Sequence, residues 1–147
     1  MNTKLPVMIP DETTPEGTIV WCGDTQQTLD FIFHFSKIIV VDNTRWFAVN
    51  PTACQEVHCR RISYYKYAEI DIEADLQFRA FLNAPKEYKW FAIDEEGIGC
   101  VFENKPHFQD GGMYDIGWSE PESITLIVGD FSQYKHLWKD ILIEREN

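Results

Sequence analysis

The feature that most constrains the fold is a pair of β-rich runs joined by a short acidic turn at residues 88–104. The first run, YKWFAID, alternates in character, and the second, GCVFEN, is apolar up to its last two residues. Between them stands EEGI, in which Gly97 supplies the turn residue. Two such runs around a turn predict a β-hairpin. A domain built on this hairpin has to cover its apolar face with further strands or helices.

Other segments predict more strands than helices. β-rich or apolar runs predict strands at 17–22, 37–50 (a hairpin), 56–70 (one long or bent strand), 113–118 and 123–129. A loop is expected at 106–112. Helices are expected at 24–35, within 72–85 and at 130–145, the first and last after capping patterns at Asp24 and Asp130. In the last helix the apolar stripe consists of Phe131, Tyr134, Trp138, Ile141 and Leu142.

These elements predict an α+β fold, a mostly antiparallel sheet of about five to seven strands with two or three helices packed on one face. A length of 147 residues is that of one ordinary domain. No Gly-, Ser- or Pro-rich linker divides the chain. We therefore expect a single domain over residues 1–147, in which residues 1–16 form an extended lead-in.

The sequence predicts a cytoplasmic protein. No run approaches the roughly 18 apolar residues of a membrane span. The N-terminus has no apolar signal core followed by a small-residue cleavage site. The four cysteines are spread along the chain, and a cytoplasmic protein keeps such thiols reduced.

Charge is the strongest global property of the chain, with 24 acidic and 13 basic side chains and a net charge of −11. Nine acids and a single base, Lys105, lie between Asp94 and Asp130. Such a protein is repelled by phosphate backbones, so direct nucleic-acid binding is not expected. The acidity either keeps the protein soluble or steers it toward a basic partner. For the second interpretation the candidate partner-binding residues are Asp94, Glu95, Glu96, Glu103, Asp110, Asp115, Glu120 and Glu122.

The sequence contains no motif for catalysis or cofactor binding. The phosphate-binding patterns G-x-x-x-x-G-K-[ST] and G-x-G-x-x-G and the nucleophile pattern G-x-S-x-G are all missing. Cys54, His58 and Cys59 lie close together, but a zinc site would need a second Cys or His pair that only the fold could supply. We therefore expect no catalytic residue, no metal and no cofactor, and a protein that is not an enzyme.

Aromatic residues are abundant, and the chain contains five tryptophans among its 10 Phe, 6 Tyr and 5 Trp. The rings either fill a small mixed core or, where they are exposed beside acidic residues, form the energetic centre of an interface.

Part of the sequence resembles small accessory proteins encoded by tailed bacteriophages. The resemblance covers roughly residues 85–145. It rests on Trp90, Ala92, Asp94, Gly97, Phe102, Glu103, Lys105, Pro106, Trp118, Trp138, Lys139, Asp140 and Leu142. Because such proteins are mostly of unknown function, the resemblance implies a phage protein and no particular reaction.

The expected function is therefore that of a non-catalytic phage accessory protein. It would bind a bacterial host protein with a basic surface, for example a defence or nucleic-acid enzyme, and inhibit or redirect it. Two alternatives stay open. One is a small enzyme or ligand-binding module with a site assembled in three dimensions from residues such as His58, Arg60, Tyr64, Tyr65 and Asp94. The other is a component of phage particle assembly.

Overall fold

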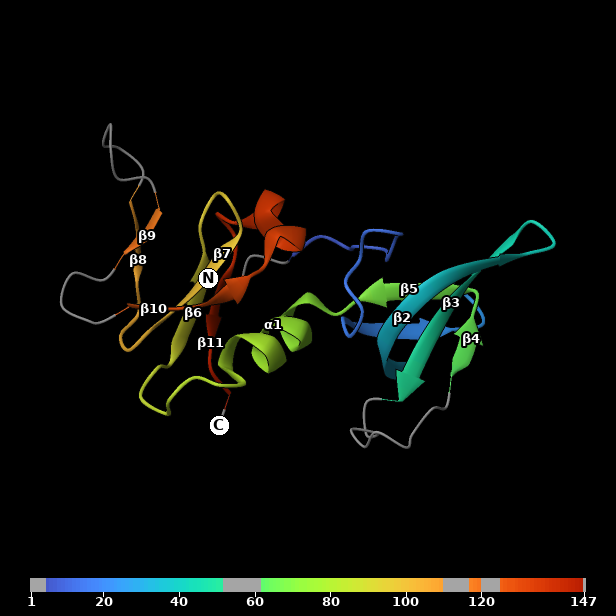
Figure 1. Ribbon diagram of the computed structural model, residues 1–147, viewed down its shortest axis with the longest axis horizontal. Helices are drawn as coiled ribbons and strands as arrows, with labels where there is room; N and C mark the ends of the chain where they lie inside the picture. Colours follow the sequence, from blue (N-terminus) through green and yellow to red (C-terminus); the bar gives the residue numbers. More distant parts are fainter. Residues whose placement is uncertain (1–4, 52–61, 110–116, 120–124, 147) are drawn as a thin grey trace. The chain divides into compact units, whose positions relative to one another are not determined.

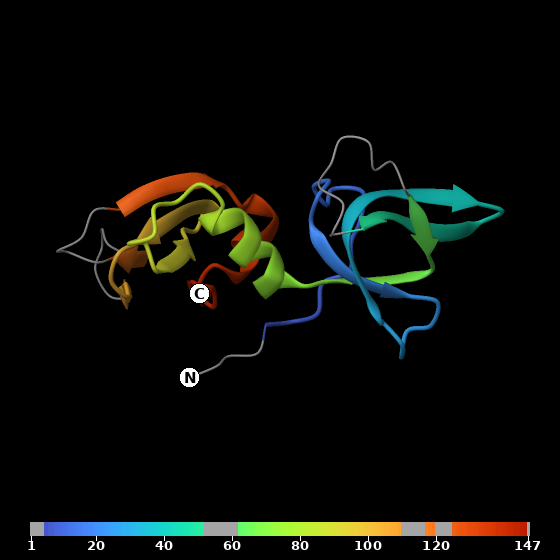
Figure 2. The same ribbon diagram turned by 90° about the horizontal axis from the view of Figure 1, so that it is seen from below.

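The chain folds into two compact units (Figures 1 and 2). The computed structural model describes residues 5–51, 62–109, 117–119 and 125–146. The N-terminal unit comprises residues 6–75, and the C-terminal unit comprises residues 76–147 with residues 1–5. From the sequence, a single domain over residues 1–147 is expected. The boundary between the units falls inside helix α1 (Ile72–Phe81), so no linker composition marks it.

The N-terminal unit is built on one antiparallel sheet of five strands in the order β4-β3-β2-β1-β5. Its strands are β1 (Ile19–Gly23), β2 (Phe31–Val41), β3 (Thr44–Pro51), β4 (Ser63–Tyr65) and β5 (Tyr67–Ile70). The sheet curls (Figure 2), and residues of β3 and β5 lie near one another although these strands do not pair. Val20, Cys22, Phe35 and Val49 are buried in its core.

The β2–β3 hairpin confirms the expectation for residues 37–50. Its turn consists of Asp42 and Asn43, whose φ angles are 50° and 63°. Positive φ at both central residues of a two-residue turn matches the twist of the flanking strands. A register shift between Phe35 and Lys37 marks a bulge in β2, and bulges of this kind bend a strand.

The helix expected at residues 24–35 is wrong. Thr25 and Thr28 form an isolated bridge in a tight turn, and β2 begins at Phe31. The capping pattern at Asp24 does not lead to a helix, because residues 31–34 pair with β1 as an antiparallel strand instead. The pairing runs from Ile19 opposite His34 to Cys22 opposite Phe31. Gly23 makes the turn feasible, since a Cβ atom there would lie 1.9 Å from the carbonyl oxygen of Thr28.

The expected helix within residues 72–85 is confirmed by α1. Its first turn is capped by Asp71, whose Oδ1 atom accepts a hydrogen bond from the backbone N–H of Ala74 at 3.1 Å. The other oxygen of Asp71 accepts the indole N–H of Trp21 at 2.8 Å. Asp75 is fully buried and accepts the backbone N–H of Ile19 at 3.2 Å. These carboxylates attach the start of α1 to strand β1.

The C-terminal unit contains a four-stranded antiparallel sheet in the order β10-β7-β6-β11 and a separate two-stranded sheet, β8-β9. Its strands are β6 (Trp90–Ile93), β7 (Ile98–Phe102), β8 (His107–Gln109), β9 (Gly117–Ser119), β10 (Thr125–Asp130) and β11 (Leu142–Glu144). The hairpin expected at residues 88–104 is thus confirmed as β6–β7. The strand expected at 123–129 is confirmed as β10.

Two expectations for this unit need correction, and a third falls partly outside the described residues. The long helix at 130–145 is wrong, because a 3-10 helix, η1 (Ser132–Leu137), is followed by strand β11, which pairs with β6. Pairing satisfies the backbone groups on that side of β6 while Phe131, Tyr134 and Ile141 stay buried. The loop expected at 106–112 contains strand β8, and residues 110–112 lie outside the described residues. Of the strand expected at 113–118, only residues 117 and 118 are described, in β9.

The fold is therefore α+β and mostly antiparallel, as expected, with fewer helices than expected. The described residues contain eleven strands, one α-helix and one 3-10 helix. Within the described ranges, no helix has the length and apolar character needed to cross a membrane.

Candidate partner-binding surfaces

The acidic turn of the β6–β7 hairpin is exposed, but its three acids differ in what they do. The Oδ1 atom of Asp94 accepts hydrogen bonds from the backbone N–H groups of Glu96 and Ile98, each at 2.9 Å. This carboxylate therefore holds the turn in shape. The side chains of Glu95 and Glu96 are exposed and form no hydrogen bond or ion pair with another described residue. The turn leaves two carboxylates available to a partner.

The structure places four of the eight candidate acids. Glu103 directly follows β7 and is half-buried, next to the turn that leads to β8. The other four, Asp110, Asp115, Glu120 and Glu122, lie outside the described residues. The acidic surface that the described residues support is therefore the hairpin turn itself.

The back of this turn is packed against the segment that follows β10. The backbone N–H of Phe131 donates to the carbonyl oxygen of Gly97 at 2.7 Å. Gly97 has a φ of 87°, and a Cβ atom there would lie 2.5 Å from the Cα atom of Ser132. The backbone N–H of Ser132 donates to Asp130, and this bond, with one from the Ser132 hydroxyl, lowers the pKa of that carboxyl. Glu95 and Glu96 are thus carried on a braced turn.

The N-terminal unit exposes most of the large apolar side chains that are exposed in the described residues. This exposed apolar set consists of Val7, Ile9, Trp21, Phe31, Val40, Val41, Ile62, Tyr64 and Tyr67. Within the unit, the ring of Phe31 lies 6.0 Å from that of Phe33, and both lie 5.7 Å from the ring of Tyr65. Phe31 is nevertheless 49% exposed. An exposed stack of rings is more typical of a contact surface than of a core.

The tryptophans mostly do not fill the cores. Trp21 is exposed, and the other four are half-buried. Lysine ammonium groups lie over three of them: Lys66 and Lys105 lie 5.5 Å from the rings of Trp46 and Trp90, respectively, and Lys139 lies 5.7 Å from that of Trp138. The cores consist mainly of phenylalanine and aliphatic side chains, so the tryptophans lie at the margins of both units.

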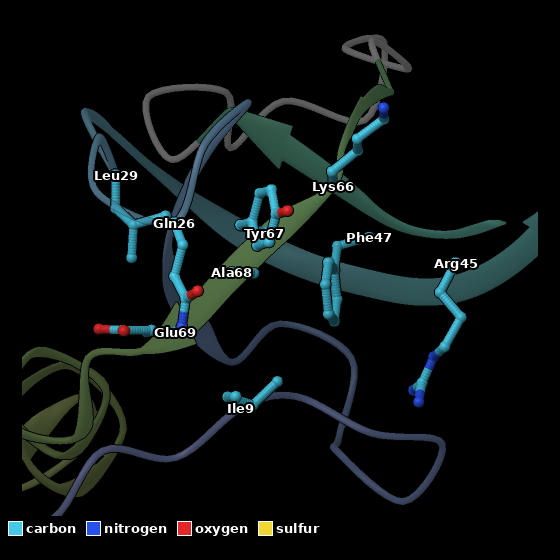
Figure 3. Close-up of a pocket in the computed structure, with 9 residues that line it drawn as sticks. All are labelled: Ile9, Gln26, Leu29, Arg45, Phe47, Lys66, Tyr67, Ala68 and Glu69. Atoms are coloured by element: carbon cyan, nitrogen blue, oxygen red, sulfur yellow. The ribbon is translucent and has the colours of Figure 1, made fainter.

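A pocket of about 220 Å³ opens in the N-terminal unit (Figure 3). It is lined by Ile9, Gln26, Leu29, Arg45, Phe47, Lys66, Tyr67, Ala68 and Glu69. Its walls are mainly apolar, from the rings of Phe47 and Tyr67 and the aliphatic side chains of Ile9 and Leu29. In Figure 3 the two cations lie on the side of Phe47, whereas Gln26, Leu29 and Glu69 lie on the opposite side. The pocket therefore combines an apolar interior with a polarised rim.

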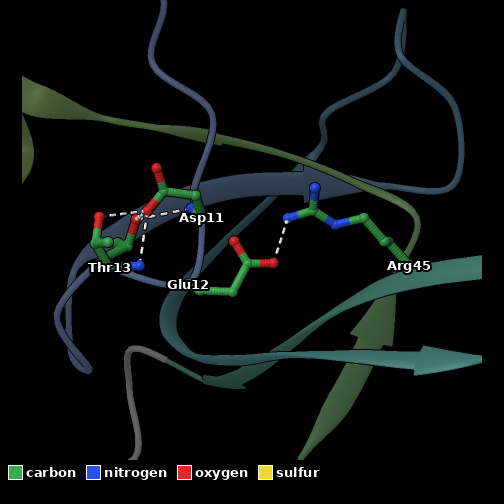
Figure 4. A network of polar contacts seen from close by, with 5 residues as sticks. Asp11, Glu12, Thr13 and Arg45 are labelled. Carbon is green, nitrogen blue, oxygen red and sulfur yellow. Dashed lines mark hydrogen bonds and ion pairs between the residues drawn. The ribbon is translucent and has the colours of Figure 1, made fainter.

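The lead-in supplies one wall of this pocket and is held in place by a small polar network (Figure 4). Asp11 accepts the hydroxyl and the backbone N–H of Thr13 at 2.6 and 2.8 Å, which lowers the pKa of its carboxyl. Glu12 pairs with Arg45 of β3 at 3.2 Å. Exposed ion pairs contribute little stability, so Arg45 can exchange Glu12 for another carboxylate at small cost. The backbone N–H of Ile70 also donates to Met8 at 2.8 Å.

The described cysteines are poor candidates for nucleophiles. Burial, with a smaller contribution from Asp24, raises the pKa of the Cys22 thiol to about 12. Burial and the charge of Asp94 also raise the pKa of Cys100. Both thiols are therefore protonated at neutral pH, and the thiol is the unreactive form.

Metal binding finds no support where the structure can be described. No group of three or more His, Cys, Asp or Glu side chains in residues 5–51, 62–109, 117–119 and 125–146 is placed to hold an ion. Cys54, His58 and Cys59, the metal candidates considered from the sequence, lie outside these ranges.

The residues of the alternative catalytic or ligand site are not gathered by the described structure. His58 and Arg60 lie outside it. Tyr64 and Tyr65 are neighbours on β4 and therefore project to opposite faces of the sheet. Tyr65 stacks on Phe31 and Phe33. Asp94 belongs to the C-terminal unit and is occupied by its own turn.

Sequence reasoning missed the pocket. Its residues come from the lead-in, the turn after β1, and strands β3 and β5. They meet only because the sheet curls, so no local spacing predicts them. The nearest signal is Lys66-Tyr67, a cation and an exposed ring in a run of aromatic residues. No family model, no characterised protein and no solved structure matches the chain, so its function has to be argued from these surfaces.

Proposed function

We propose that this chain is a non-catalytic accessory protein that binds another protein and thereby inhibits or redirects it. The observation that carries the proposal is the exposed apolar set of the N-terminal unit, which includes Trp21, Phe31, Tyr64 and Tyr67. Aromatic side chains supply much of the binding energy of protein interfaces. Within this set Phe31 joins a cluster of rings with Phe33 and Tyr65, and exposed apolar side chains that adjoin one another are typical of a contact surface.

The proposed partner is a bacterial host protein with a basic surface, met in the host cytoplasm. The resemblance of residues 85–145 to phage accessory proteins supports the source. Glu95 and Glu96 on the braced β6–β7 turn support the charge of the partner. Rim charges of this kind act mainly on the rate of association and on its salt dependence. The apolar contacts would supply most of the affinity, and the acids would guide the approach.

The proposal is tested by affinity capture from a bacterial lysate with four full-length baits. They are the wild type, an aromatic variant (Phe31→Ser with Tyr64→Ser), an acid variant (Glu95→Gln with Glu96→Gln) and a control (Lys86→Gln). All the substituted side chains are exposed, so the folds should be retained, and circular dichroism checks this. Captured proteins are identified by mass spectrometry after low-salt and high-salt washes.

We expect one host protein to be captured by the wild type and the control and lost by the aromatic variant. With the purified partner, the aromatic variant should bind about tenfold or more weakly, the effect of losing an interface anchor. The acid variant should bind a few-fold more weakly at low salt and like the wild type at high salt. If every protein captured by the wild type is also captured by the aromatic variant, the proposal is wrong.

A further inference from the structure

Strand β5 is an edge strand of the described sheet, and the lead-in occupies part of this edge at Ile70. On one side it pairs with β1, and the N–H of Asp71, just after β5, donates to Ile19 of β1 at 2.9 Å. The N–H of Ile70 points the other way, to Met8. Because backbone groups alternate along an antiparallel strand, Ala68 also directs its N–H and C=O away from β1. Neither group has a hydrogen-bond partner among the described residues. Ala68 is only 4% exposed and lines the pocket, so these are buried and unpaired backbone groups, whose cost a bound segment would relieve.

The pocket lies directly beside this edge. Tyr67, Ala68 and Glu69 of β5 all line it, and so does Ile9, which follows the residue that already pairs with Ile70. Ile9 is 62% exposed and Tyr67 is 41% exposed, although both form its apolar wall. A volume of about 220 Å³ is below the roughly 300–1,000 Å³ of pockets that enclose whole small molecules. It suits one large apolar side chain.

Charges of opposite sign lie at the two ends of β5. Lys66 stands at the start of β5 and Glu69 near its end, and both line the pocket. The ammonium group of Lys66 lies over the Trp46 ring and pairs with no carboxylate in the described residues. Arg45 adds a second cation on the same rim, held only by the exposed pair with Glu12. A ligand complementary to this rim carries an acid at the end next to Lys66 and Arg45.

We infer that the β5 edge and its pocket bind an extended peptide segment of the partner, with an apolar side chain flanked by an acidic residue. The segment adds to the sheet by hydrogen bonds to the backbone of Ala68, as in other cases of strand addition. Its apolar side chain enters the pocket between Phe47 and Tyr67, and its carboxylate faces Lys66. This inference rests on the proposed function, because it specifies how the partner is held.

The experiment begins with a displayed library of random ten-residue peptides, selected on the full-length protein. The best peptide is then synthesised, and its Kd is measured by calorimetry with the wild type, Tyr67→Ala, Lys66→Glu and the control Lys86→Glu. Lys86 is an exposed lysine of the C-terminal unit, so the control has the same change of charge far from the pocket in sequence. A series of peptides N-methylated at one position each, and the exchange rate of the Ala68 amide, report the backbone contact.

We expect the selected peptides to share an apolar residue with Asp or Glu nearby. Lys66→Glu and Tyr67→Ala should each weaken binding about tenfold, while Lys86→Glu leaves it unchanged. N-methylation should weaken binding about three- to tenfold at alternate positions only, the period of a strand. The Ala68 amide should exchange more slowly in the complex.

Three results would overturn the inference. The first is a library that yields no peptide preferring the wild type to Lys66→Glu. The second is a set of selected peptides that bind without slowing exchange at Ala68. The third is protection of the Ala68 amide that rises with protein concentration in the absence of peptide, which would assign the edge to a second copy of the chain. The proposed function is judged separately, by whether Lys66→Glu and Tyr67→Ala still capture the host protein. A partner retained by both variants would leave that function standing without this site.

Discussion

Two hairpins of this protein share the tripeptide Trp-Phe-Ala and nearly the same local pattern, yet their turns are supported differently. In β2–β3 the tripeptide begins at Trp46, and in β6–β7 it begins at Trp90. In both, the tryptophan is half-buried and the next two residues are buried. The β2–β3 turn is exposed, with only the positive φ angles of Asp42 and Asn43 to set its shape. The β6–β7 turn is pressed against Ser132 and bonded to Phe131.

The difference shows that local sequence determines the strands of a hairpin. The residues packed against its turn determine how much stability a substitution in the turn costs. A turn without close neighbours requires only residues that tolerate a positive φ. A braced turn also has to leave space for the segment behind it. The acids proposed to meet a partner, Glu95 and Glu96, sit on the braced turn, so their positions are fixed before binding and little ordering is needed.

The largest effect is expected for Gly97→Ala. Alanine would have to adopt a φ of 87°, and its Cβ atom would lie 2.5 Å from the Cα atom of Ser132. Backbone strain and overpacking together should cost about 3 kcal/mol. Hydrogen exchange of amides in β6 and β7 measures the loss. The matched control is Gly17→Ala, at a φ of 96° with nothing within 4 Å, which should cost only about 1 kcal/mol. Equal losses at both glycines would mean that contact with Ser132 does not decide the cost.

A second brace of the C-terminal unit is Arg145, and Arg145→Met should remove about 2 kcal/mol of stability. Its guanidinium donates to the carbonyl oxygens of Phe81, Ala84, Pro85 and Tyr88 at 2.7–3.3 Å and lies over the Phe81 ring. Methionine keeps the apolar stem and removes every donor. Arg145→Lys should recover only part of the loss, because an ammonium group cannot reach all four oxygens. Urea unfolding of the three proteins gives the order, and a lysine variant as stable as wild type would contradict it.

At the exposed turn, Asn43→Ala should cost only about 1 kcal/mol, the strain of a φ of 63° in alanine. Asn43→Gly should be neutral or slightly stabilising, because glycine is preferred at this place of such a turn. Thermal unfolding of both variants measures the difference. The comparison of the two hairpins would lose its basis if Asn43→Ala destabilised the protein as much as Gly97→Ala.

The smallest expected effect is a loss of stability of the β6–β7 turn at acidic pH. The backbone N–H and then the hydroxyl of Ser132 lower the pKa of Asp130 below its usual value of 3.8. A carboxyl with a lowered folded-state pKa contributes stability above its unfolded-state pKa and loses it as pH falls through the folded-state value. The braced turn should therefore loosen below about pH 4, seen as a lower protection factor of the Phe131 amide, that is, a lower ratio of the intrinsic to the observed exchange rate at each pH. Asp130→Asn should remove this pH dependence. Unchanged dependence in that variant would assign it to another carboxyl.

Much of the strand content could be predicted from the sequence. The hairpins at 37–50 and 88–104, the strand before Gly23 and the helix before Pro85 depend on turn residues and periodicity, which act over a few positions. The buried positions of the final stretch, Phe131, Tyr134 and Ile141, were also predicted, although the element that buries them was not.

Other features depended on pairing between distant segments. The capping pattern at Asp24 favoured a helix, but β1 supplied a partner strand for residues 31–34. Residues 142–144, expected to be helical, likewise form a strand because they pair with β6. The pocket and the unpaired backbone groups of Ala68 belong to this class, since both require β5 to return beside β1.

The sequence by itself determined the local properties of this protein: the positions of most strands, the acidic turn between two of them, and the number of aromatic rings that the fold has to bury or expose. The tertiary structure decided which rings stay exposed, which acids are used by their own turns, and which residues from distant segments line a pocket. The physical reason is that turns and periodicity are energies of neighbouring residues, whereas strand pairing and exposure are energies of segments that meet only after the chain has folded.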